Sequence, residues 1–353
     1  MKKTLIYVFL LFFILIIFEL FNGFWFRSQL EKNILNLNAL YDIDIKINPN
    51  DYYQNNQNIS YVRNKYGLRI NCQKIHDIDI VSIGGSTTDQ RYIDYKDTFS
   101  YILQEKLSKH LGSSICIANS GVDGHRLVSN IDSLENWFPL IPSFNPKYYL
   151  LNIGINDSAL ISTKSLQSTS NNNTFLSYLK FQVISNSYLY WFSKKIQNII
   201  GINLNQYGVL NHKKGIKKDF EYTSFKKSHK FENDIILNSD IFASNYERII
   251  KIITARGAKP ICVTQQALFV KNGMGIDKAF PYKDTYLNGL DLQFSLNLIN
   301  KKITEICSNE NALIVNIENN HFTESDFYDF VHHNPQGSKK LANLIFDTIK
   351  NRF

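Results

Sequence analysis

The chain has 353 residues, of which 44% are hydrophobic and 20% charged, which excludes a disordered protein; its 16 glycines and 7 prolines exclude a collagen-like or low-complexity one. At about 150 residues per domain, this length predicts two domains, or one domain with a large insertion. The formal net charge is +8, but five of these eight positive charges fall between residues 211 and 230. Because the charge is local and no zinc-finger, RRM or basic-zipper pattern is present, we expect no nucleic-acid partner.

The first 26 residues form a hydrophobic segment. Lys2 and Lys3 are followed by residues 4–21, which carry no charge apart from Glu19 and as a helix would span about 27 Å, close to the hydrocarbon thickness of a bilayer. No small-residue cleavage pattern follows, so we predict an uncleaved signal anchor and expect a membrane as a partner. The positive-inside rule then keeps the N-terminus in the cytoplasm and places the rest of this single-pass protein on the periplasmic or extracytoplasmic side. A buried core helix is the alternative.

Residues 27–75 are polar and rich in Asn and Tyr, and we interpret them as a stalk or as a wrap over the domain that follows. From residue 76 to 353, short apolar runs alternate with longer amphipathic ones. The short runs predict strands over residues 78–83, 115–118, 148–153, 260–264 and 313–317. The longer runs predict helices over residues 98–111, 126–137, 241–255, 290–307 and 335–349. This alternation implies a doubly wound α/β domain with a parallel five-stranded sheet, and it places the expected site at the carboxyl edge of the sheet.

The alternation stops between residues 158 and 240, which we interpret as an insertion after the third strand, far longer than ordinary loops. We expect a helical cap over the active site. We expect the aromatic residues of this insertion to pack against the domain, and sugar binding or membrane contact is the alternative. Seven lysines within residues 211–230 predict an exposed loop, with contact to anionic lipid or glycan as the alternative.

The four cysteines are widely separated and form no CxxC pair, which excludes a zinc site or a redox motif built on that spacing. Cys116 and Cys262 lie inside apolar runs, and we interpret them as buried thiols that pack as small hydrophobic groups. The cysteines therefore indicate little about the compartment.

Three strand ends carry residues suited to acyl chemistry. The first strand ends in Gly-Gly-Ser, which places Ser86 at the carboxyl edge of the sheet beside helix N-terminal amides and makes it a candidate nucleophile. The loop after the second strand holds Gly124, and Asn156 follows the third strand. The backbone N–H groups of Ser86 and Gly124 and the side-chain amide of Asn156 would form an oxyanion hole. Each loop taken singly also fits an ordinary turn or helix cap.

Asp329 and His332 precede the last helix, whose start is predicted by Asn334 and Pro335. A separation of three residues lets the Asp329 carboxylate reach the Nδ1–H of His332, so that Nε2 can take a proton from Ser86. A surface cap is the alternative for either residue.

Three further residues flank these candidates. His333 is the competing base, but only His332 has an aspartate three residues before it. His125 and Asp157 are candidates for lining the pocket, and a solvent-facing loop position is the alternative for His125. No HExxH or paired-cysteine spacing is present, so we expect no metal.

The order Gly-x-Ser, Asn-x-Gly-x-x-Gly, Gly-x-Asn-Asp and Asp-x-x-His resembles that of the SGNH (GDSL-type) serine hydrolases over about residues 76–160 and 241–353. The resemblance implies a flavodoxin-like three-layer fold, no cofactor, Ser86 as nucleophile, Asp329 and His332 as acid and base, and Gly124 and Asn156 as oxyanion donors. The first motif reads Gly-Gly-Ser-Thr-Thr rather than Gly-Asp-Ser-Leu, which weakens any assignment to the lipase-like branch. Residues 64–69 also resemble a segment common in bacterial envelope members.

The resemblance and the expected location together imply a membrane-anchored serine esterase of the cell envelope. Its expected substrates are O-acyl esters of envelope glycans, above all O-acetyl esters, or other small esters. Acyl transfer to a sugar hydroxyl by the same acyl-enzyme is one alternative. A catalytically silent glycan-binding or assembly protein is the other.

Overall fold

The structure of the protein is a computed structural model. It describes residues 2–23, 25–53, 57–159, 186–190, 192–193, 223–224, 231–271, 278–279, 287–318 and 322–352. Most of the predicted insertion, with nearly all of its lysine segment, lies outside the described residues, so the expected helical cap stays a prediction.

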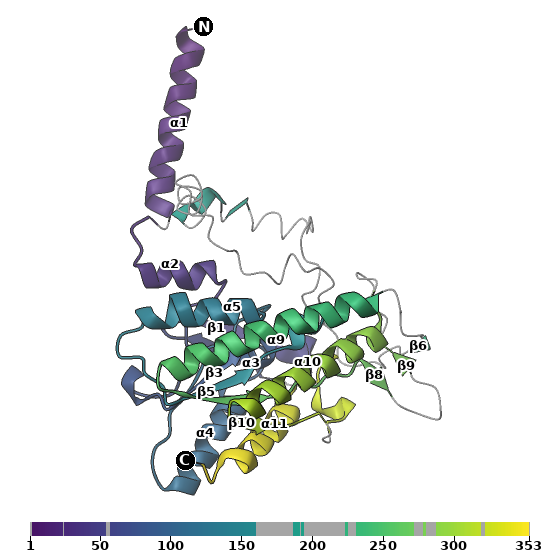
Figure 1. Cartoon of the computed structure of the whole chain (residues 1–353). Coiled ribbons are helices and arrows are strands. Elements are labelled where there is room, and N and C mark those ends of the chain that lie inside the picture. The colour runs from purple at the N-terminus through teal and green to yellow at the C-terminus, as the bar shows by residue number, and fades with distance from the viewer. Residues whose placement is uncertain are drawn as a thin grey trace.

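Five parallel strands form the central sheet (Figure 1). In chain order they are β3 (Ile80–Gly84), β4 (Ile117–Asn119), β5 (Tyr148–Asn152), β7 (Lys259–Val263) and β10 (Leu313–Val315). Across the sheet they run β10-β7-β5-β3-β4, and every neighbouring pair is parallel. Numbered along the chain and read from β4, this order is 2-1-3-4-5, the flavodoxin-like order. The predicted parallel sheet is therefore confirmed, because each strand lies within two residues of the predicted bounds.

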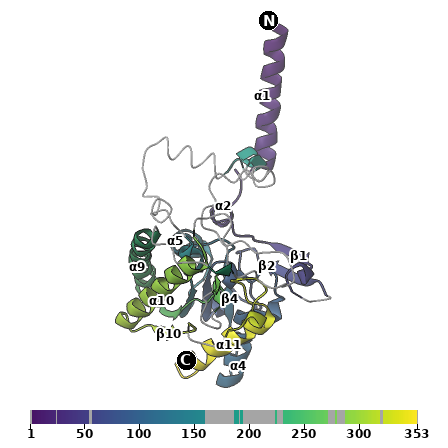
Figure 2. The ribbon, with the colours of Figure 1, turned by 90° about the vertical axis from the view of Figure 1, so that its right-hand side faces the viewer.

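Helices cover both faces of this sheet, as Figure 2 shows. They are α4 (Phe99–Leu111), α5 (Leu127–Asp132), α9 (Glu232–Ala255), α10 (Gly289–Asn309) and α11 (Pro335–Ile349). Residues such as Val81 and Leu151 pack into one hydrophobic cluster with α5, α9 and α10, while their neighbours Ile80 and Leu150 pack into another with α4 and α11. Because successive strand residues point to opposite faces, the near-continuous apolar strands fill both clusters and produce three layers.

Two helices differ by more than two residues from the predicted bounds, and the start of a third agrees with its prediction. The predicted helix over residues 126–137 ends as an α-helix at Asp132 and continues as a π-helical turn over Ser133–Trp137. Helix α9 begins nine residues before the predicted start. Helix α11 begins where Asn334 and Pro335 predict it, because the Asn334 side chain accepts the Gly337 N–H at 3.0 Å.

Residues 27–75, here called the wrap segment, pack on the α/β body. They form helix α2 (Gln29–Asn36) and a hairpin of two antiparallel strands, β1 (Ile43–Ile47) and β2 (Ile59–Arg63). Ile34 and Leu68 are fully buried in the cluster that contains Val81 of the sheet. The described part of this segment therefore contributes to the hydrophobic core of the body.

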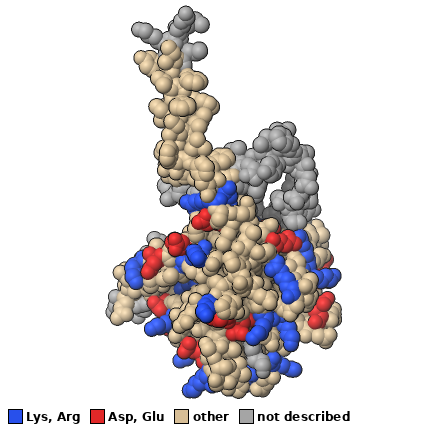
Figure 3. Space-filling model, turned by 90° about the vertical axis from the view of Figure 1, so that its left-hand side faces the viewer, with Lys and Arg blue, Asp and Glu red and all other residues tan. Residues whose placement is uncertain are grey.

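The N-terminal helix α1 (Lys2–Asn22) projects from this body in both ribbon views (Figures 1 and 2). Its described apolar side chains are exposed from Ile6 to Phe21, and on the face in Figure 3 the described surface of the helix above its base shows no Lys, Arg, Asp or Glu. At that base the Glu19 carboxylate accepts the N–H groups of Tyr188 and Leu189 at 2.7 and 3.1 Å. No helix in the described part of the chain has the length and hydrophobicity that a membrane crossing needs.

All four cysteines are paired in disulfides, so the interpretation of Cys116 and Cys262 as buried thiols is wrong. One disulfide joins Cys72 of the wrap segment to Cys116 beside strand β4. The other joins Cys262 of β7 to Cys307 of α10. The partners are 44 and 45 residues apart, and no local sequence pattern marks such pairs.

Three very short strands, β6 (Thr223–Ser224), β8 (Val270–Lys271) and β9 (Lys278–Ala279), form a separate antiparallel sheet that the sequence did not predict.

Candidate active site

Ser86 stands at the carboxyl end of the sheet. Strand β3 runs directly into helix α3 (Ser86–Asp89), whose first residue is the serine. A glycine is needed just before it, because a Cβ on Gly85 would lie 2.6 Å from Nδ2 of Asn156 and 2.9 Å from the His125 carbonyl oxygen. The sharp strand-to-helix turn therefore presents the Ser86 side chain at the sheet edge, with the N-terminal N–H groups of α3 beside it.

The Ser86 hydroxyl meets the ring of His332 from the far end of the chain. Oγ of Ser86 lies 2.7 Å from Nε2 of His332, and Nδ1 of the same ring lies 2.7 Å from Oδ2 of Asp329. When Nδ1–H donates to the carboxylate, Nε2 is left as the acceptor for the serine proton. The structure thus brings together the three residues that the sequence proposed as nucleophile, base and acid, in the order that acyl transfer requires.

The loop that carries Asp329 and His332 is held by its own backbone. Oδ1 of Asp329 accepts the N–H groups of Val331 and His332 at 2.9 and 2.7 Å, and the Tyr328 N–H donates to the His332 carbonyl at 2.9 Å. The Asp329 carboxylate is therefore fixed by three N–H donors, one of them the imidazole. Such a carboxylate orients the ring of His332 and stabilises its protonated form.

Tyr328 also orients the base, and the sequence analysis missed it. Its ring lies parallel to that of His332, with an interplanar angle of 8° and a centroid distance of 5.5 Å. The tyrosine thus covers one face of the imidazole. An aromatic residue four positions before a histidine is too common a pattern to have been singled out.

The neighbouring His333 does not compete as the base. Its ring stacks on Phe322 and Phe327, with centroid distances of 4.7 and 4.6 Å. Burial lowers the pKa of His333 to about 3, so the ring is neutral and belongs to the core.

The expected oxyanion donors lie around the Gly85–Ser86 turn. The Nδ2 group of Asn156, from the short helix α6 (Ile155–Ser158), donates to the His125 carbonyl at 2.9 Å, and both groups face Gly85. That amino group carries a second hydrogen for an oxyanion. Gly124 lies in the same loop as His125 and has a φ of +76°, a conformation that favours glycine. The structure therefore places Asn156 and the loop of Gly124 beside the nucleophile.

His125 and Asp157, the two candidates for lining the pocket, are both buried and hydrogen-bonded inside the protein. The His125 ring is buried, and its Nε2 lies 2.6 Å from the Leu37 carbonyl of the wrap segment. Burial lowers the pKa of His125 to about 4, so the neutral ring serves as a packing group rather than the solvent-facing residue that was the alternative. The Asp157 carboxylate is also buried, and both its oxygens accept the Leu127 N–H at the start of α5.

Asp157 predicts a specific pH dependence of stability. Burial raises the pKa of its carboxyl from 3.8 to about 7, so ionisation above that pH places a charge in the core. The stability contributed by the protonated group is complete below its unfolded pKa and is lost as the pH rises through about 7. We therefore expect Asp157→Asn, which keeps an acceptor for Leu127, to make the variant more stable than wild type at pH 8 but not at pH 4.

Urea unfolding of both proteins at these two pH values measures the effect. The control is Asp347→Asn, since that carboxylate is mostly exposed and should show the wild-type pH dependence. An identical pH dependence of the free energy of unfolding in wild type and Asp157→Asn would contradict the assignment.

The described residues contain no group of three or more His, Cys, Asp or Glu side chains arranged to hold a metal ion. The site itself offers an alcohol, an imidazole, a carboxylate and N–H donors, which is the set used in acyl transfer through an acyl-enzyme.

Comparison of the sequence with protein-family models finds no match, and comparison with curated proteins finds none either. The structure is similar to an α/β-hydrolase enzyme from the metagenome of Lake Arreo, Spain, at 11% identity and a TM-score of 0.42, covering 78% of this chain and 97% of that one. It is also similar to an acetylxylan esterase from Geobacillus stearothermophilus, at 12% identity and a TM-score of 0.44, covering 76% and 93%. A third similar structure is a GDSL-like lipase from Bacteroides thetaiotaomicron, at 13% identity and a TM-score of 0.42, covering 80% of this chain and 93% of that one.

Identities of 11–13% and TM-scores of 0.42–0.44 do not indicate which reaction this chain catalyses. The chain itself has the sheet order and the serine, histidine and aspartate placement that its resemblance to the SGNH hydrolases predicts.

Proposed function

We propose that the protein is a serine esterase of the SGNH kind. The observation that carries the proposal is the pair of 2.7 Å contacts that join Oγ of Ser86 to His332 and His332 to Asp329. Residues 86 and 332 are separated by most of the chain. A structural role for this buried contact would not require an alcohol, an imidazole and a carboxylate in series at the carboxyl edge of a parallel sheet.

The reaction follows from these contacts. His332 takes the Ser86 proton as Oγ attacks the ester carbonyl, and the negative oxygen of the tetrahedral intermediate is held by the N–H groups of Ser86 and Gly124 and by Asn156. The protonated imidazole then gives its proton to the leaving alcohol, and the acyl group stays on Ser86. Water, deprotonated by His332, releases the acid and restores the serine.

We propose O-acyl esters of cell-envelope glycans as substrates, and O-acetyl esters first among them. The domain's place outside the cytoplasm is supported by its two disulfides, since disulfides persist in oxidising compartments and are rare in the cytosol. The class of ester is supported by the resemblance of the four motifs and residues 64–69 to envelope-associated members of that family.

We also propose that residues 1–26 anchor the protein in the membrane with the N-terminus in the cytoplasm. The support comes from the sequence, which has Lys2 and Lys3 before a long apolar run, and from the exposure of the described apolar side chains between Ile6 and Phe21. Exposed apolar side chains on this scale need a lipid or protein environment.

Acyl release by the purified full-length protein tests the proposed function. We expect acetate release from O-acetylated oligosaccharides and from 4-nitrophenyl acetate. A second assay, with a 14C-acetyl ester and an unacetylated oligosaccharide, separates hydrolysis from acyl transfer. Hydrolysis would release the label as acetate, whereas acyl transfer would place it on the oligosaccharide. Absence of both products with every ester would contradict the proposal.

A further inference from the structure

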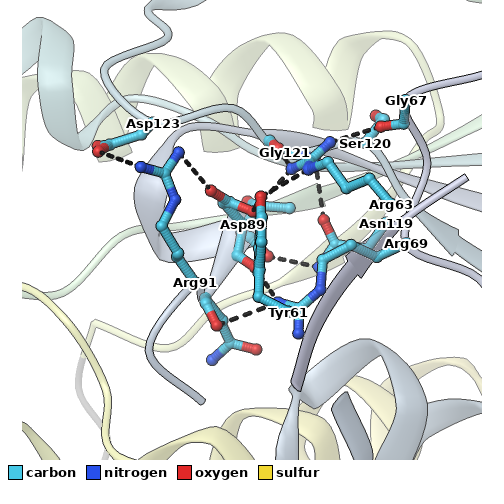
Figure 4. A network of polar contacts seen from close by, with 12 residues as sticks. Tyr61, Arg63, Gly67, Arg69, Asp89, Arg91, Asn119, Ser120, Gly121 and Asp123 are labelled. Atoms are coloured by element: carbon cyan, nitrogen blue, oxygen red, sulfur yellow. Dashed lines mark hydrogen bonds and ion pairs between the residues drawn. The ribbon is translucent and has the colours of Figure 1, made fainter. Parts of the chain in front are cut away.

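Asp89 is a buried carboxylate that the reaction does not use. It lies three residues after the nucleophile, at the end of helix α3, and is 1% exposed. Its Oδ1 accepts hydrogen bonds from Nη2 of Arg63 and from the Tyr61 hydroxyl, both at 2.7 Å (Figure 4). Burial would raise the pKa of Asp89, but the charges of Arg63, Arg91 and Arg69 lower it below 3.8. The group is thus a fixed negative charge beneath the nucleophile.

The arginines around Asp89 reach from the nucleophile helix to residues 120–125, here called the oxyanion loop because it carries Gly124. The guanidinium of Arg63 donates to the Gly121 carbonyl as well as to Asp89. Arg91 lies between two carboxylates: its Nη2 is 3.4 Å from Oδ2 of Asp89, and its Nη1 is 3.8 Å from Oδ2 of Asp123. Asp123 is the residue before Gly124. Figure 4 shows both arginines bridging Asp89 and the oxyanion loop in this way.

Direct packing completes the connection between α3 and the oxyanion loop. A Cβ on Gly121 would lie 2.4 Å from the Asp89 nitrogen, so the two backbones touch where only glycine fits. The Asn119 side chain donates to the Thr88 carbonyl at 2.5 Å and accepts the Gly121 N–H at 2.9 Å. The loop and the helix therefore form one unit.

The wrap segment supplies the groups that hold this unit. Arg63 and Tyr61 come from strand β2, and Nε of Arg63 donates to the Tyr61 hydroxyl at 2.6 Å. Arg69 donates to the carbonyls of Asp89 and Gln90 at the end of α3, while its backbone pairs with Asn119. A helix of four residues has no stability of its own, so its position depends on such contacts.

We propose that Arg63 and Asp89 are positioning residues, which hold the oxyanion loop against the nucleophile helix and thereby set the spacing between Ser86 and the N–H group of Gly124. This inference rests on the proposed function, because it concerns the same site. It makes the wrap segment a part of the catalytic machinery. Oxyanion donors act only when they are held at the place where the negative charge develops, so a displaced loop lowers kcat rather than substrate binding.

Two variants test the positioning role. Arg63→Lys keeps a positive charge beside Asp89 but lacks the planar fork that reaches several acceptors at once. The double variant Arg63→Met with Asp89→Asn removes the buried ion pair but keeps an acceptor for the Tyr61 hydroxyl and for Arg91. In both we expect kcat for 4-nitrophenyl acetate to fall about 10²-fold, the loss that a misplacement of about 1 Å causes, while KM stays near the wild-type value.

Urea unfolding of each variant separates positioning from folding. The control is Arg248→Lys, because Arg248 forms a comparable ion pair with Glu135 on the surface, at 2.6 Å, and should keep the wild-type kcat. A reduced kcat in variants that unfold cooperatively supports the proposal. A wild-type kcat in either folded variant would overturn it, and so would loss of cooperative unfolding in both variants, since the pair would then serve folding alone. A wild-type protein without ester hydrolysis would overturn the proposed function itself.

Discussion

Replacing Ser86 with alanine should lower ester hydrolysis by about 10⁴-fold or more while leaving the fold intact. In the proposed reaction this hydroxyl carries the acyl chain, so its loss would remove the covalent intermediate rather than slow its formation. Oγ of Ser86 contacts Nε2 of His332, so the change removes one buried hydrogen bond and creates little space. The measurement is the rate of acetate release, with urea unfolding as the test of the fold.

The matched control is Ser158→Ala. Ser158 is also buried in a short helix at the carboxyl edge of the sheet, but its hydroxyl donates to the Ile155 carbonyl in its own helix. We expect Ser158→Ala to keep the wild-type rate. Equal acetate release by wild type and Ser86→Ala would rule out the proposed nucleophile.

His332→Gln should reduce the rate by about 10⁴-fold, because glutamine keeps hydrogen-bonding capacity but cannot take the serine proton. The loss should appear in kcat, since the imidazole acts on the reacting atoms. The Asp329 carboxylate keeps the N–H groups of Val331 and His332 as donors in this variant, so the loop should retain its shape. Steady-state kinetics with 4-nitrophenyl acetate measures the change.

His76→Gln provides the comparison for this variant, because the His76 side chain is 61% exposed and its Nε2 contacts the carboxylate of Asp77 rather than a residue of the site. It should show the wild-type kcat. A value of kcat in His332→Gln within about tenfold of wild type would contradict the role of the base, since general base catalysis contributes about 10² to 10⁴.

The sequence predicted the parts of the molecule that have local signals. Apolar runs of about five residues identified the strands, because a parallel sheet covered on both faces needs such runs. Ser86, Asn156 and His332 could be found because each follows a strand or precedes a helix start, and parallel topology brings those positions to one edge. Topology alone places these side chains at the same edge of the sheet without showing that they touch. The 2.7 Å distance between Oγ of Ser86 and Nε2 of His332 is seen only in the structure.

The features that the sequence did not reveal depend on distant pairings. Arg63 lies in the polar stretch of the wrap segment, where no local pattern singles it out, and in the structure it is 2% exposed. The burial of Asp157 and His125 likewise depends on distant contacts, with the Leu127 N–H at the start of α5 and with the Leu37 carbonyl of the wrap segment. The disulfides join cysteines whose spacing carries no information.

The most direct test of the account is the reaction of the full-length protein with a fluorophosphonate, followed by mass spectrometry of its peptides. A fluorophosphonate reacts with a serine that a neighbouring base has activated and leaves a stable adduct on its oxygen. We predict a single adduct on Ser86 in the wild-type protein and a strongly reduced labelling rate in His332→Gln. An adduct on another residue, no adduct in the folded wild-type protein, or an equal labelling rate in the two proteins would contradict the claim that His332 activates Ser86.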